Sequence, residues 1–275
     1  MNAMSGRNTV LQPYDSTYDP LVAKSPGRGL DYAPSYWVAS AGAPPEDDGP
    51  ITGDCDVDVV VVGGGSTGMS TAMYLAEDHG IKAVVLEANQ TAWGCSSRSG
   101  GQGQNASGRL SRSQWIERWG MDTAKRLDTE IRRGFDNFKQ LTKDIECEAF
   151  DGGHLYMAHK PAKMAYLRNM AQVRNDYFGY QTKILSAEEV RERYCDEREH
   201  FGAMLEEEGV GVHPLKLTFG IMRKARAMGV KVHPASPVQG LTTVNGIHHI
   251  QTPGGVVRAK RVVFCTGGYT WQKMH

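Results

Sequence analysis

The sequence lacks an excess of either charge, a paired-cysteine pattern and a long apolar run. Its 31 basic residues balance 31 acidic ones, so no broad electrostatic field would draw it to nucleic acid or to an anionic membrane. The five cysteines are odd in number, scattered and free of any Cys-x-x-Cys pair, which is typical of reduced thiols rather than of a disulfide framework or a zinc site. No stretch approaches the roughly 18 apolar residues of a membrane span, and no basic segment followed by an apolar one opens the chain. We therefore predict a cytoplasmic protein that binds small molecules, with no metal site, no nucleic-acid partner and no membrane span.

The most informative segment is a dinucleotide-binding fingerprint in its full context. A valine-rich run over residues 57–62 leads into G-G-G-S-T-G at 63–68, a helix-like stretch follows, and a second apolar run over 83–86 ends on Glu87. A lone glycine motif is weak evidence, but strand, glycines, helix, strand and acid in this order are specific. The alternative is a glycine turn in an ordinary βαβ unit that binds nothing.

Each glycine in this fingerprint has a physical role. Gly63 permits a tight turn off the strand, Gly65 lets the backbone approach a pyrophosphate, and Gly68 lets the helix pack closely on the sheet. The helix then directs its free N–H groups and the positive end of its dipole at the phosphates. Because the carboxylate of Glu87 can accept hydrogen bonds from ribose hydroxyls, the pattern predicts a ligand with an unphosphorylated adenosine ribose.

A second segment, W-G-C-S-S-R-S-G-G-Q at residues 93–102, is too rich in glycine and small hydroxyls for a helix or a buried strand. Such a run exposes backbone N–H groups to an anion. Ser96 could donate to a phosphate oxygen, and Arg98 could neutralise one with its planar, permanently charged guanidinium. The alternative is a surface loop with an ordinary arginine.

The remaining pattern predicts an α/β fold. Apolar periodicity indicates an amphipathic helix over 122–145, and Pro161, a Ser186/Glu189 capping box and Pro214 each open a further helix. After a strand over 230–233, strands over 238–244 and 247–252 flank Asn245-Gly246, a pair suited to a two-residue hairpin turn. A third short strand around residues 256–257 and a last strand over 262–265 complete the pattern. An antiparallel three-strand excursion before the closing strand is hard to reconcile with a plain nicotinamide-binding unit.

Six blocks carry a resemblance to a known family: V-V-V-V-G-G-G-S-T-G at 59–68, V-V-L-E at 84–87, G-C-S-S-R-S-G-G-Q at 94–102, G-M-D-T-A at 120–124, G-V-H-P-L at 211–215 and V-V-F-C-T-G-G at 262–268. They resemble the flavin-dependent amine and amino-acid oxidases of the D-amino-acid oxidase type, with glycine oxidase, sarcosine oxidase and gamma-glutamylputrescine oxidase among its members. The resemblance runs from about Tyr32 to the last residue. It implies a Rossmann-like FAD-binding domain, built of a central parallel sheet with an antiparallel three-strand meander, and an inserted α+β substrate domain.

The resemblance also implies the site residues, with FAD as the cofactor. The pyrophosphate contacts would come from Gly63, Gly65, Ser66, Thr67 and Gly68, the adenosine ribose contacts from Glu87 and Ala88, the phosphate side from Ser96 and Arg98, the isoalloxazine edge from Gly100, Gly101 and Gln102, the adenine contact from the backbone of Val238, and closure over the dinucleotide from Thr266 and Gly267. The catalytic residues are not determined. Gln102, Asn105 and His213 are weak candidates, and a histidine before a proline is more often a helix-start residue than a catalyst.

By the same resemblance the reaction is oxidation of a C–N bond in a small amine or amino acid, in which a hydride goes to the flavin and water hydrolyses the resulting imine. Family members continue well past the T-G-G strand, so we expect this chain to be truncated at its C-terminus and to turn over weakly or not at all unless a second polypeptide completes it. Two alternatives stay open: an NAD-dependent dehydrogenase, and a non-catalytic flavin-binding fragment or subunit. The substrate, the choice of oxygen or quinone as acceptor, and homo-oligomerisation stay open too.

The predicted organisation has four segments. Residues 1–52, with recurring prolines and no apolar period, form an extended N-terminal arm. Residues 53–146 are the first segment of the FAD-binding domain, 147–205 are part of the substrate domain, and 206–275 are the second segment of the FAD-binding domain.

Overall fold

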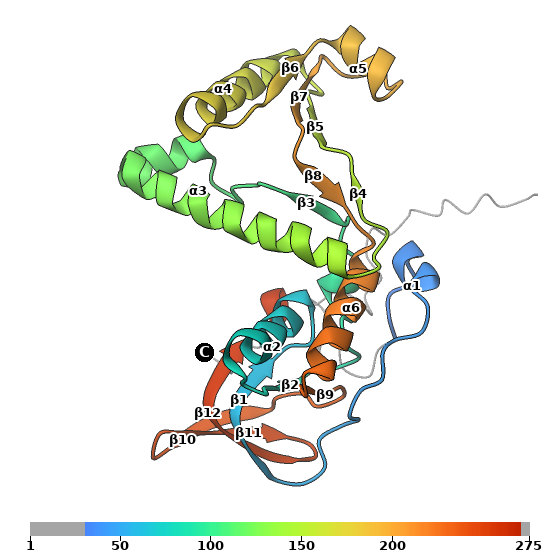
Figure 1. The fold of residues 1–275 in the computed structure, drawn as a ribbon, viewed down its shortest axis with the longest axis vertical. Helices are drawn as coiled ribbons and strands as arrows, with labels where there is room; N and C mark the ends of the chain where they lie inside the picture. The colour runs from blue at the N-terminus through green and yellow to red at the C-terminus, as the bar shows by residue number, and fades with distance from the viewer. Residues whose placement is uncertain (1–30, 271–275) are drawn as a thin grey trace, which may run out of the picture. The chain divides into compact units, whose positions relative to one another are not determined.

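The computed structural model describes residues 31–270, and the chain divides into two compact units (Figure 1). Among the described residues, unit 1 holds 31–98 and 218–270, and unit 2 holds 99–217. Residues 1–30 of the predicted arm and the last five residues lie outside the described part. None of the helices within residues 31–270 is long and apolar enough to cross a bilayer.

Unit 1 is built on one mixed six-stranded sheet with the order β10-β11-β12-β1-β2-β9. The strands are β1 (Cys55–Val62), β2 (Val84–Leu86), β9 (Lys231–His233), β10 (Gly240–Val244), β11 (Ile247–Thr252) and β12 (Gly255–Phe264). Strands β12, β1, β2 and β9 are parallel, whereas β10, β11 and β12 form an antiparallel meander. In the centre Val60 lies between Val262 and Val84, and the run 59–62 is buried throughout, as expected of a parallel strand covered on both faces. The predicted fold class is confirmed.

Helix α2 (Ser66–His79) follows β1 directly and packs on the sheet. Its buried face holds Met69, Ala72 and Met73, which are the small and flexible side chains that recur at steps of three and four in the sequence. The helix ends at Gly80 in the left-handed conformation, with φ of 66°, where an L side chain would be strained. Helix α6 (Pro214–Ala227) buries Leu215, Phe219, Met222 and Ala225, the face that its periodicity predicts.

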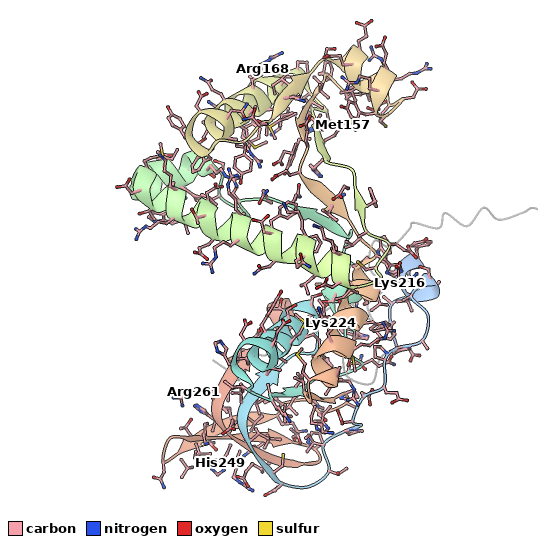
Figure 2. All side chains as sticks on the ribbon, in the orientation of Figure 1. Met157, Arg168, Lys216, Lys224, His249 and Arg261 are labelled. Carbon is pink, nitrogen blue, oxygen red and sulfur yellow. The ribbon has the colours of Figure 1, made fainter. Side chains whose placement is uncertain are left out.

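The two strands expected around 256–257 and over 262–265 are one strand, β12. The expectation of two strands was wrong because Lys260 and Arg261 interrupt the apolar pattern. Both are exposed, and Figure 2 labels Arg261 on this strand. Lys260 pairs with Asp58 on β1 at 2.7 Å, so a charged pair across two parallel strands continues the ladder where apolar residues stop. The hairpin turn at Asn245 and Gly246 is confirmed, with φ of 51° and 80°.

The described part of the N-terminal arm is attached to unit 1. Asp48 pairs with Arg226 and Lys231 and accepts a hydrogen bond from the Val232 N–H at 2.8 Å. The Tyr32 hydroxyl donates to the Thr91 carbonyl at 2.6 Å. The arm also forms a short helix, α1 (Tyr36–Ser40), which the absence of an apolar period did not predict. Local hydrogen bonding explains it, since Ser35 caps the helix by accepting from the Val38 N–H.

Unit 2 has α+β architecture. Its helices are α3 (Arg112–Asp144), α4 (Pro161–Phe178) and α5 (Ala187–Arg193). One antiparallel sheet has the order β3 (Gln102–Gln104), β8 (Gly209–Gly211), β4 (Phe150–Asp151), and the other has the order β5 (His154–Met157), β7 (Ala203–Glu206), β6 (Lys183–Leu185).

Helix α3 begins ten residues before the helix expected over 122–145. The earlier start follows from a capping box in which Ser111 accepts from the Gln114 N–H and the Gln114 side chain accepts from the Ser111 N–H. Gly120, at φ of 80°, breaks the helical conformation, which is why the periodicity is continuous only after it. Helix α3 contacts α4 and β3 and belongs with them to unit 2, which runs from Ser99 to Leu217. The sequence pattern places the inserted segment at 147–205.

Candidate functional site

Three parallel strands of unit 1 end at one edge of the sheet. Strand β1 ends before Gly63, β2 before Glu87 and β12 before Cys265. The Gly63 N–H donates to the Leu86 carbonyl at 2.8 Å, and the Cys265 N–H donates to the Val62 carbonyl at 2.7 Å. From β1 the chain passes through α2 to β2 on one side, while β12 lies on the other side. The edge is therefore a topological switch point, where open α/β sheets bind ligands.

The glycine loop lies so close to its neighbours that side chains are excluded. Gly63 has φ of 109°, and a Cβ there would lie 2.6 Å from the Cys265 carbonyl oxygen. A Cβ on Gly68 would lie 1.9 Å from the Gly63 carbonyl oxygen, and one on Gly65 would lie 2.9 Å from Ser96 Oγ. These contacts match the roles of turn and close packing that the sequence assigns to Gly63 and Gly68. Gly65 leaves open the space beside Ser96.

Glu87 connects the end of β2 to this loop. Its Oε2 accepts from the Gly64 N–H at 2.7 Å and its Oε1 accepts from the Asn89 N–H at 2.9 Å. Burial raises the pKa of the carboxyl, and the hydrogen bonds from Asn89 and Gly64 oppose the rise. Each carboxylate oxygen keeps a second lone pair, so the group retains acceptor capacity for ribose hydroxyls. The neighbouring Ala88 is exposed.

The segment before β10 lies beside Glu87. The Ser236 N–H donates to the Glu87 carbonyl at 2.8 Å, and the Ala235 N–H donates to the Asn89 carbonyl at 2.9 Å. Val238 is buried in the apolar cluster that contains Leu86. The backbone around Val238 is thereby held near Glu87, the candidate residue for binding the ribose.

The loop after β2 meets the N-terminus of α2 through Ser96. Ser96 Oγ accepts from the Ser66 N–H at 2.9 Å and from the Ser66 hydroxyl at 3.0 Å. Arg98 donates to two carbonyls of its own loop, from Nε to Gly94 at 3.1 Å and from Nη2 to Trp93 at 2.6 Å. Its guanidinium also lies 4.7 Å from the centre of the Trp93 ring. Arg98 therefore braces the loop that carries Ser96, and its charge lies at this edge of the sheet.

The segment after β12 returns to the same loop. Thr266 follows β12 and precedes a 3₁₀ turn over Gly267–Tyr269, in which Gly267 has φ of 55°. Tyr269 in that turn makes an edge contact with Trp93, with ring centres 5.7 Å apart, and a Cβ on Gly94 would lie 3.3 Å from its ring. Sequence reasoning missed Tyr269, because no local pattern connects it to a loop so far away along the chain.

The other predicted site residues belong to unit 2. Gly101 has φ of 69°, and a Cβ there would lie 2.0 Å from the Val212 carbonyl oxygen. Gly100 and Gln102 are exposed, and Gln102 pairs with Gly211 across β3 and β8.

His213 is 1% exposed, and burial lowers the pKa of its imidazole. The imidazole Nδ1 accepts from the Lys216 N–H at 3.2 Å, and the backbone N–H of His213 donates to the Cys147 carbonyl at 2.8 Å. These contacts are those of a residue that starts a helix, which is the role that its position before Pro214 favours.

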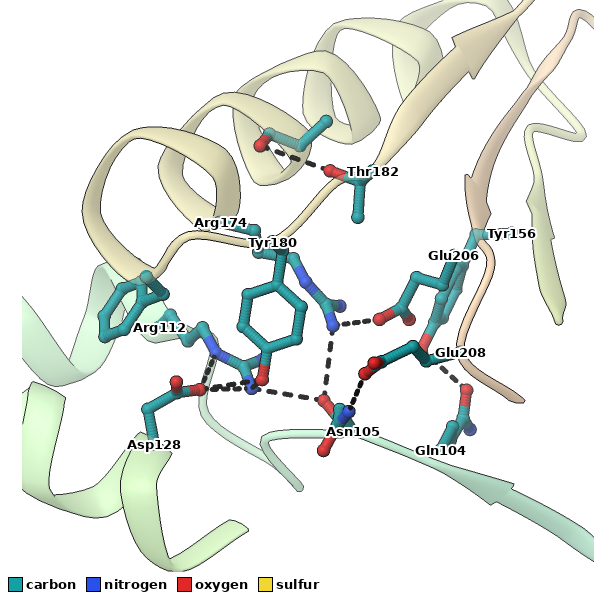
Figure 3. A network of polar contacts seen from close by, with 12 residues as sticks. Gln104, Asn105, Arg112, Asp128, Tyr156, Arg174, Tyr180, Thr182, Glu206 and Glu208 are labelled. Atoms are coloured by element: carbon teal, nitrogen blue, oxygen red, sulfur yellow. Dashed lines mark hydrogen bonds and ion pairs between the residues drawn. The ribbon is translucent and has the colours of Figure 1, made fainter. Parts of the chain in front are cut away.

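A buried ionic network lies in the interior of unit 2 (Figure 3). Arg112, which is 4% exposed, donates from Nε to Asp128 Oδ1 at 2.6 Å. The Tyr180 hydroxyl accepts from Arg112 at 2.6 Å and donates to Asp128 at 3.0 Å. Burial raises the pKa of Tyr180 to about 12, so the hydroxyl keeps its proton. A second ion pair belongs to the same network: Arg174 on α4 pairs with Glu206 on β7, and both side chains are buried.

The two arginines converge on Asn105, directly after β3. The backbone carbonyl oxygen of Asn105 accepts from Arg112 Nη2 at 3.2 Å and from Arg174 Nη2 at 3.3 Å (Figure 3). The Asn105 side chain donates from Nδ2 to Glu208 at 3.1 Å. Charged groups from two helices therefore fix a residue that the sequence singles out only weakly. The apolar periodicity of the helix did not indicate this network, because the pattern of apolar residues says nothing about the polar residues between them.

The residues of unit 1 fit a dinucleotide. They provide an N-terminal helix turn with donors, backbone approach at three glycines, a hydroxyl at Ser96 and an acceptor at Glu87. The cradle at Gly63, Gly65 and Gly68 is one that a Cβ would fill.

Comparison with known proteins gives consistent results. The profile of the family described as "FAD dependent oxidoreductase" (DAO) matches residues 58–275. The chain is 32% identical over 252 residues to gamma-glutamylputrescine oxidoreductase of Escherichia coli K12, covering 89% of this chain and 56% of that protein. Among solved structures, glycine oxidase from Geobacillus kaustophilus is similar with a TM-score of 0.64 and 20% identity, covering 78% of this chain and 56% of that one. L-proline dehydrogenase from P. horikoshii is similar with a TM-score of 0.62 and 20% identity, over 80% of this chain and 54% of that one.

The chain spans only about half the length of the curated relatives it matches, between 51% and 56%. The two structural similarities show the fold, and the family profile covers most of the chain, from the first central strand onward. The resemblance derived from the six sequence blocks is thereby confirmed.

Proposed function

Because the chain belongs to the DAO family of FAD-dependent oxidoreductases, we propose that unit 1 binds FAD and that the whole protein oxidises the C–N bond of an amine or amino acid. The observation that carries the proposal is the convergence of the glycine loop, Glu87 and Ser96 at the edge where β1, β2 and β12 end. The curated relative with 32% identity is named for an amine substrate, gamma-glutamylputrescine, which supports a substrate of this class.

We propose specific roles for the residues of unit 1. The N–H groups at the start of α2 and the hydroxyl of Ser96 bind the pyrophosphate, and Glu87 accepts from the adenosine ribose. The backbones around Val238 and Gly267 enclose the dinucleotide. Arg98 acts through its charge and through the loop that it braces.

When bound, FAD would accept a hydride from the carbon next to a neutral amine. The protein then has to hold that carbon against the flavin and favour the unprotonated amine. In unit 2, we propose that Gly100, Gly101 and Gln102 lie along the flavin edge. We also propose that the network of Arg112 and Arg174 keeps Asn105, the residue after β3, in one position. The electron acceptor is oxygen or a quinone. A cytoplasmic location is proposed from the scattered, unbonded cysteines.

The test combines binding and reduction. Purified chain is titrated with FAD and, separately, with NADH, and the FAD complex is then mixed anaerobically with a gamma-glutamyl polyamine, an N-methyl amino acid or a D-amino acid. We expect flavin binding, and bleaching of the flavin absorbance by an amine of one of these classes. Binding of NADH without FAD would reject the proposal in favour of a nicotinamide-dependent dehydrogenase.

A second candidate is a flavin-binding subunit or fragment without catalysis. It is favoured by one observation, that the glycine loop, Glu87 and Ser96 account for binding of the cofactor without supplying a catalytic residue. Retention of FAD without reduction by any of the three amine classes, in the chain alone and with candidate partner polypeptides, would support it.

A further inference from the structure

Three hydroxyl groups form a chain from the interior of unit 1 to the start of α2. Thr218, on α6, is 0% exposed, and its Oγ1 lies 2.9 Å from Ser66 Oγ. Ser66 Oγ in turn lies 3.0 Å from Ser96 Oγ. Ser66 and Ser96 are both half-buried. The hydroxyl chain therefore has one end in the protein interior, at Thr218, and the other near the surface, at Ser96.

The number of protons gives this chain a direction. A hydroxyl has one proton and accepts up to two hydrogen bonds. Ser66 donates its hydroxyl proton to Ser96. In the contact between Thr218 Oγ1 and Ser66 Oγ either oxygen can be the donor, and only a Thr218 proton directed at Ser66 leaves the Ser66 proton for Ser96. Ser96 Oγ receives both the hydroxyl and the N–H of Ser66, which fills its two acceptor positions. Its own proton must then point away from Ser66.

The open end of the chain lies at the candidate phosphate site. A Cβ on Gly65 would lie 2.9 Å from Ser96 Oγ, so the Ser96 hydroxyl lies directly against the glycine loop and the first turn of α2. Ser96 takes up the N–H of Ser66 and offers its own O–H in exchange. Hydrogen bonds in series polarise one another, so the arrangement makes Ser96 a better donor toward an anion.

We propose that Thr218 is a positioning residue of the cofactor site, whose buried hydroxyl orients Ser66 and Ser96 so that Ser96 donates to a phosphate oxygen of FAD. This inference rests on the proposed function. Thr218 contributes through the hydroxyl chain and needs no contact with the cofactor. It lies 152 positions from Ser66 in the sequence, and no motif marks it.

The experiment compares two substitutions at one position. Thr218→Val removes the hydroxyl and keeps the shape, whereas Thr218→Ser keeps the hydroxyl. Apo-protein is titrated with FAD, and binding is followed by the loss of flavin fluorescence. We expect Thr218→Val to weaken FAD binding about 3- to 10-fold, the range that one net hydrogen bond gives, and Thr218→Ser to stay within about twofold of the wild type.

Thr252→Val is the matched control. Thr252 is also a buried threonine of unit 1, and its Oγ1 donates to the Gly255 carbonyl at 2.8 Å, in the β11–β12 turn. This variant should bind FAD like the wild type. Thermal unfolding of both apo variants separates loss of binding from loss of stability. If Thr218→Val does not fold, Ser66→Ala interrupts the same hydroxyl chain from a half-buried position and should give the same loss.

A double-mutant cycle tests the route through Ser96. If Thr218 acts through the hydroxyl chain, Thr218→Val has no further effect on FAD binding once Ser96→Ala is present. The inference is overturned if valine and serine at 218 weaken binding equally, if Thr218→Val leaves binding unchanged, or if it costs as much in the Ser96→Ala background. A wild-type chain that binds no FAD would refute the proposed function as well, whereas normal wild-type binding with any of these outcomes refutes the inference alone.

Discussion

Substitution of Gly68 by alanine tests whether the close approach of α2 to the glycine loop is needed for cofactor binding. A Cβ at this position would lie 1.9 Å from the Gly63 carbonyl oxygen, 3.1 Å from its carbon and 3.3 Å from Val61 Cγ1. The Gly63 peptide cannot move aside freely, because its N–H is bonded to the Leu86 carbonyl and Cys265 lies against the glycine. The start of α2 must therefore shift by about 1.5 Å to restore an ordinary contact distance.

Two effects on stability oppose each other in this variant. Overpacking costs about 1–3 kcal/mol, and alanine in place of glycine in a helix returns up to about 1 kcal/mol. The net loss should be on the order of 1–2 kcal/mol. FAD binding should suffer more, because a shift of about 1.5 Å takes hydrogen bonds from the helix N-terminus to a phosphate beyond their normal length. Since each such bond to a charged group contributes about 1.5–3 kcal/mol, we expect at least tenfold weaker binding.

The assays are urea unfolding of the apo-protein and titration with FAD followed by flavin fluorescence. Gly134→Ala is the control, because Gly134 lies within α3 and a Cβ there would meet nothing within 4 Å. That variant should gain about 0.5–1 kcal/mol of stability and bind FAD normally. A Gly68→Ala protein that is as stable as Gly134→Ala and binds FAD as tightly would refute the reasoning.

Three further predictions concern carboxylates. Asp128→Asn should lower the free energy of unfolding by roughly 3 kcal/mol in urea melts, because it leaves Arg112 buried without its anionic partner, whereas the exposed Asp136→Asn should cost less than about 1 kcal/mol. Burial opposes ionisation of Asp128, but hydrogen bonds and charge from Arg132 and Arg112 outweigh it and lower the pKa of the carboxyl. The stability that the carboxylate contributes is therefore present above about pH 4 and is lost as the pH falls through its folded pKa. The difference in stability between wild type and Asp128→Asn should accordingly shrink in melts below about pH 4. Glu87→Gln should weaken FAD binding and lower the melting temperature, because an amide NH₂ would face an N–H donor; unchanged values for both would contradict the role assigned to the carboxylate.

Much of unit 1 is predictable from the sequence because its signals are local. The turn at Gly63, the small-residue face of α2 and the end of β2 at Glu87 lie within one short βαβ unit, so residue types close together in the sequence mark all three. The hairpin at Asn245 is equally local, since positive φ at two adjacent residues specifies it. By contrast, the sequence pattern predicts two short strands in place of β12. The carboxylate that pairs with Lys260 lies on β1, 202 positions away, so no local pattern shows it.

Unit 2 is harder to predict for a different reason. Its strands are two to four residues long, too short to show a clear alternation. The network around Asn105 joins residues of α3, α4 and β7 whose polar character alone gives no indication that they are buried. A charged residue on an amphipathic helix is usually solvated, and only the packing of a second helix against α3 removes Arg112 and Asp128 from water.

The sequence by itself determined the dinucleotide-binding fold and the chemical type of its ligand, because the absence of a Cβ at defined positions and an acid at a strand end act through backbone geometry over a few residues. Only the tertiary structure decided which distant groups complete the site. The parallel pairing of β12 with β1, the contact of Tyr269 with Trp93 and the hydroxyl of Thr218 behind Ser66 join segments about 150 or more positions apart. Such contacts depend on how helices and strands pack in space, which no local pattern specifies.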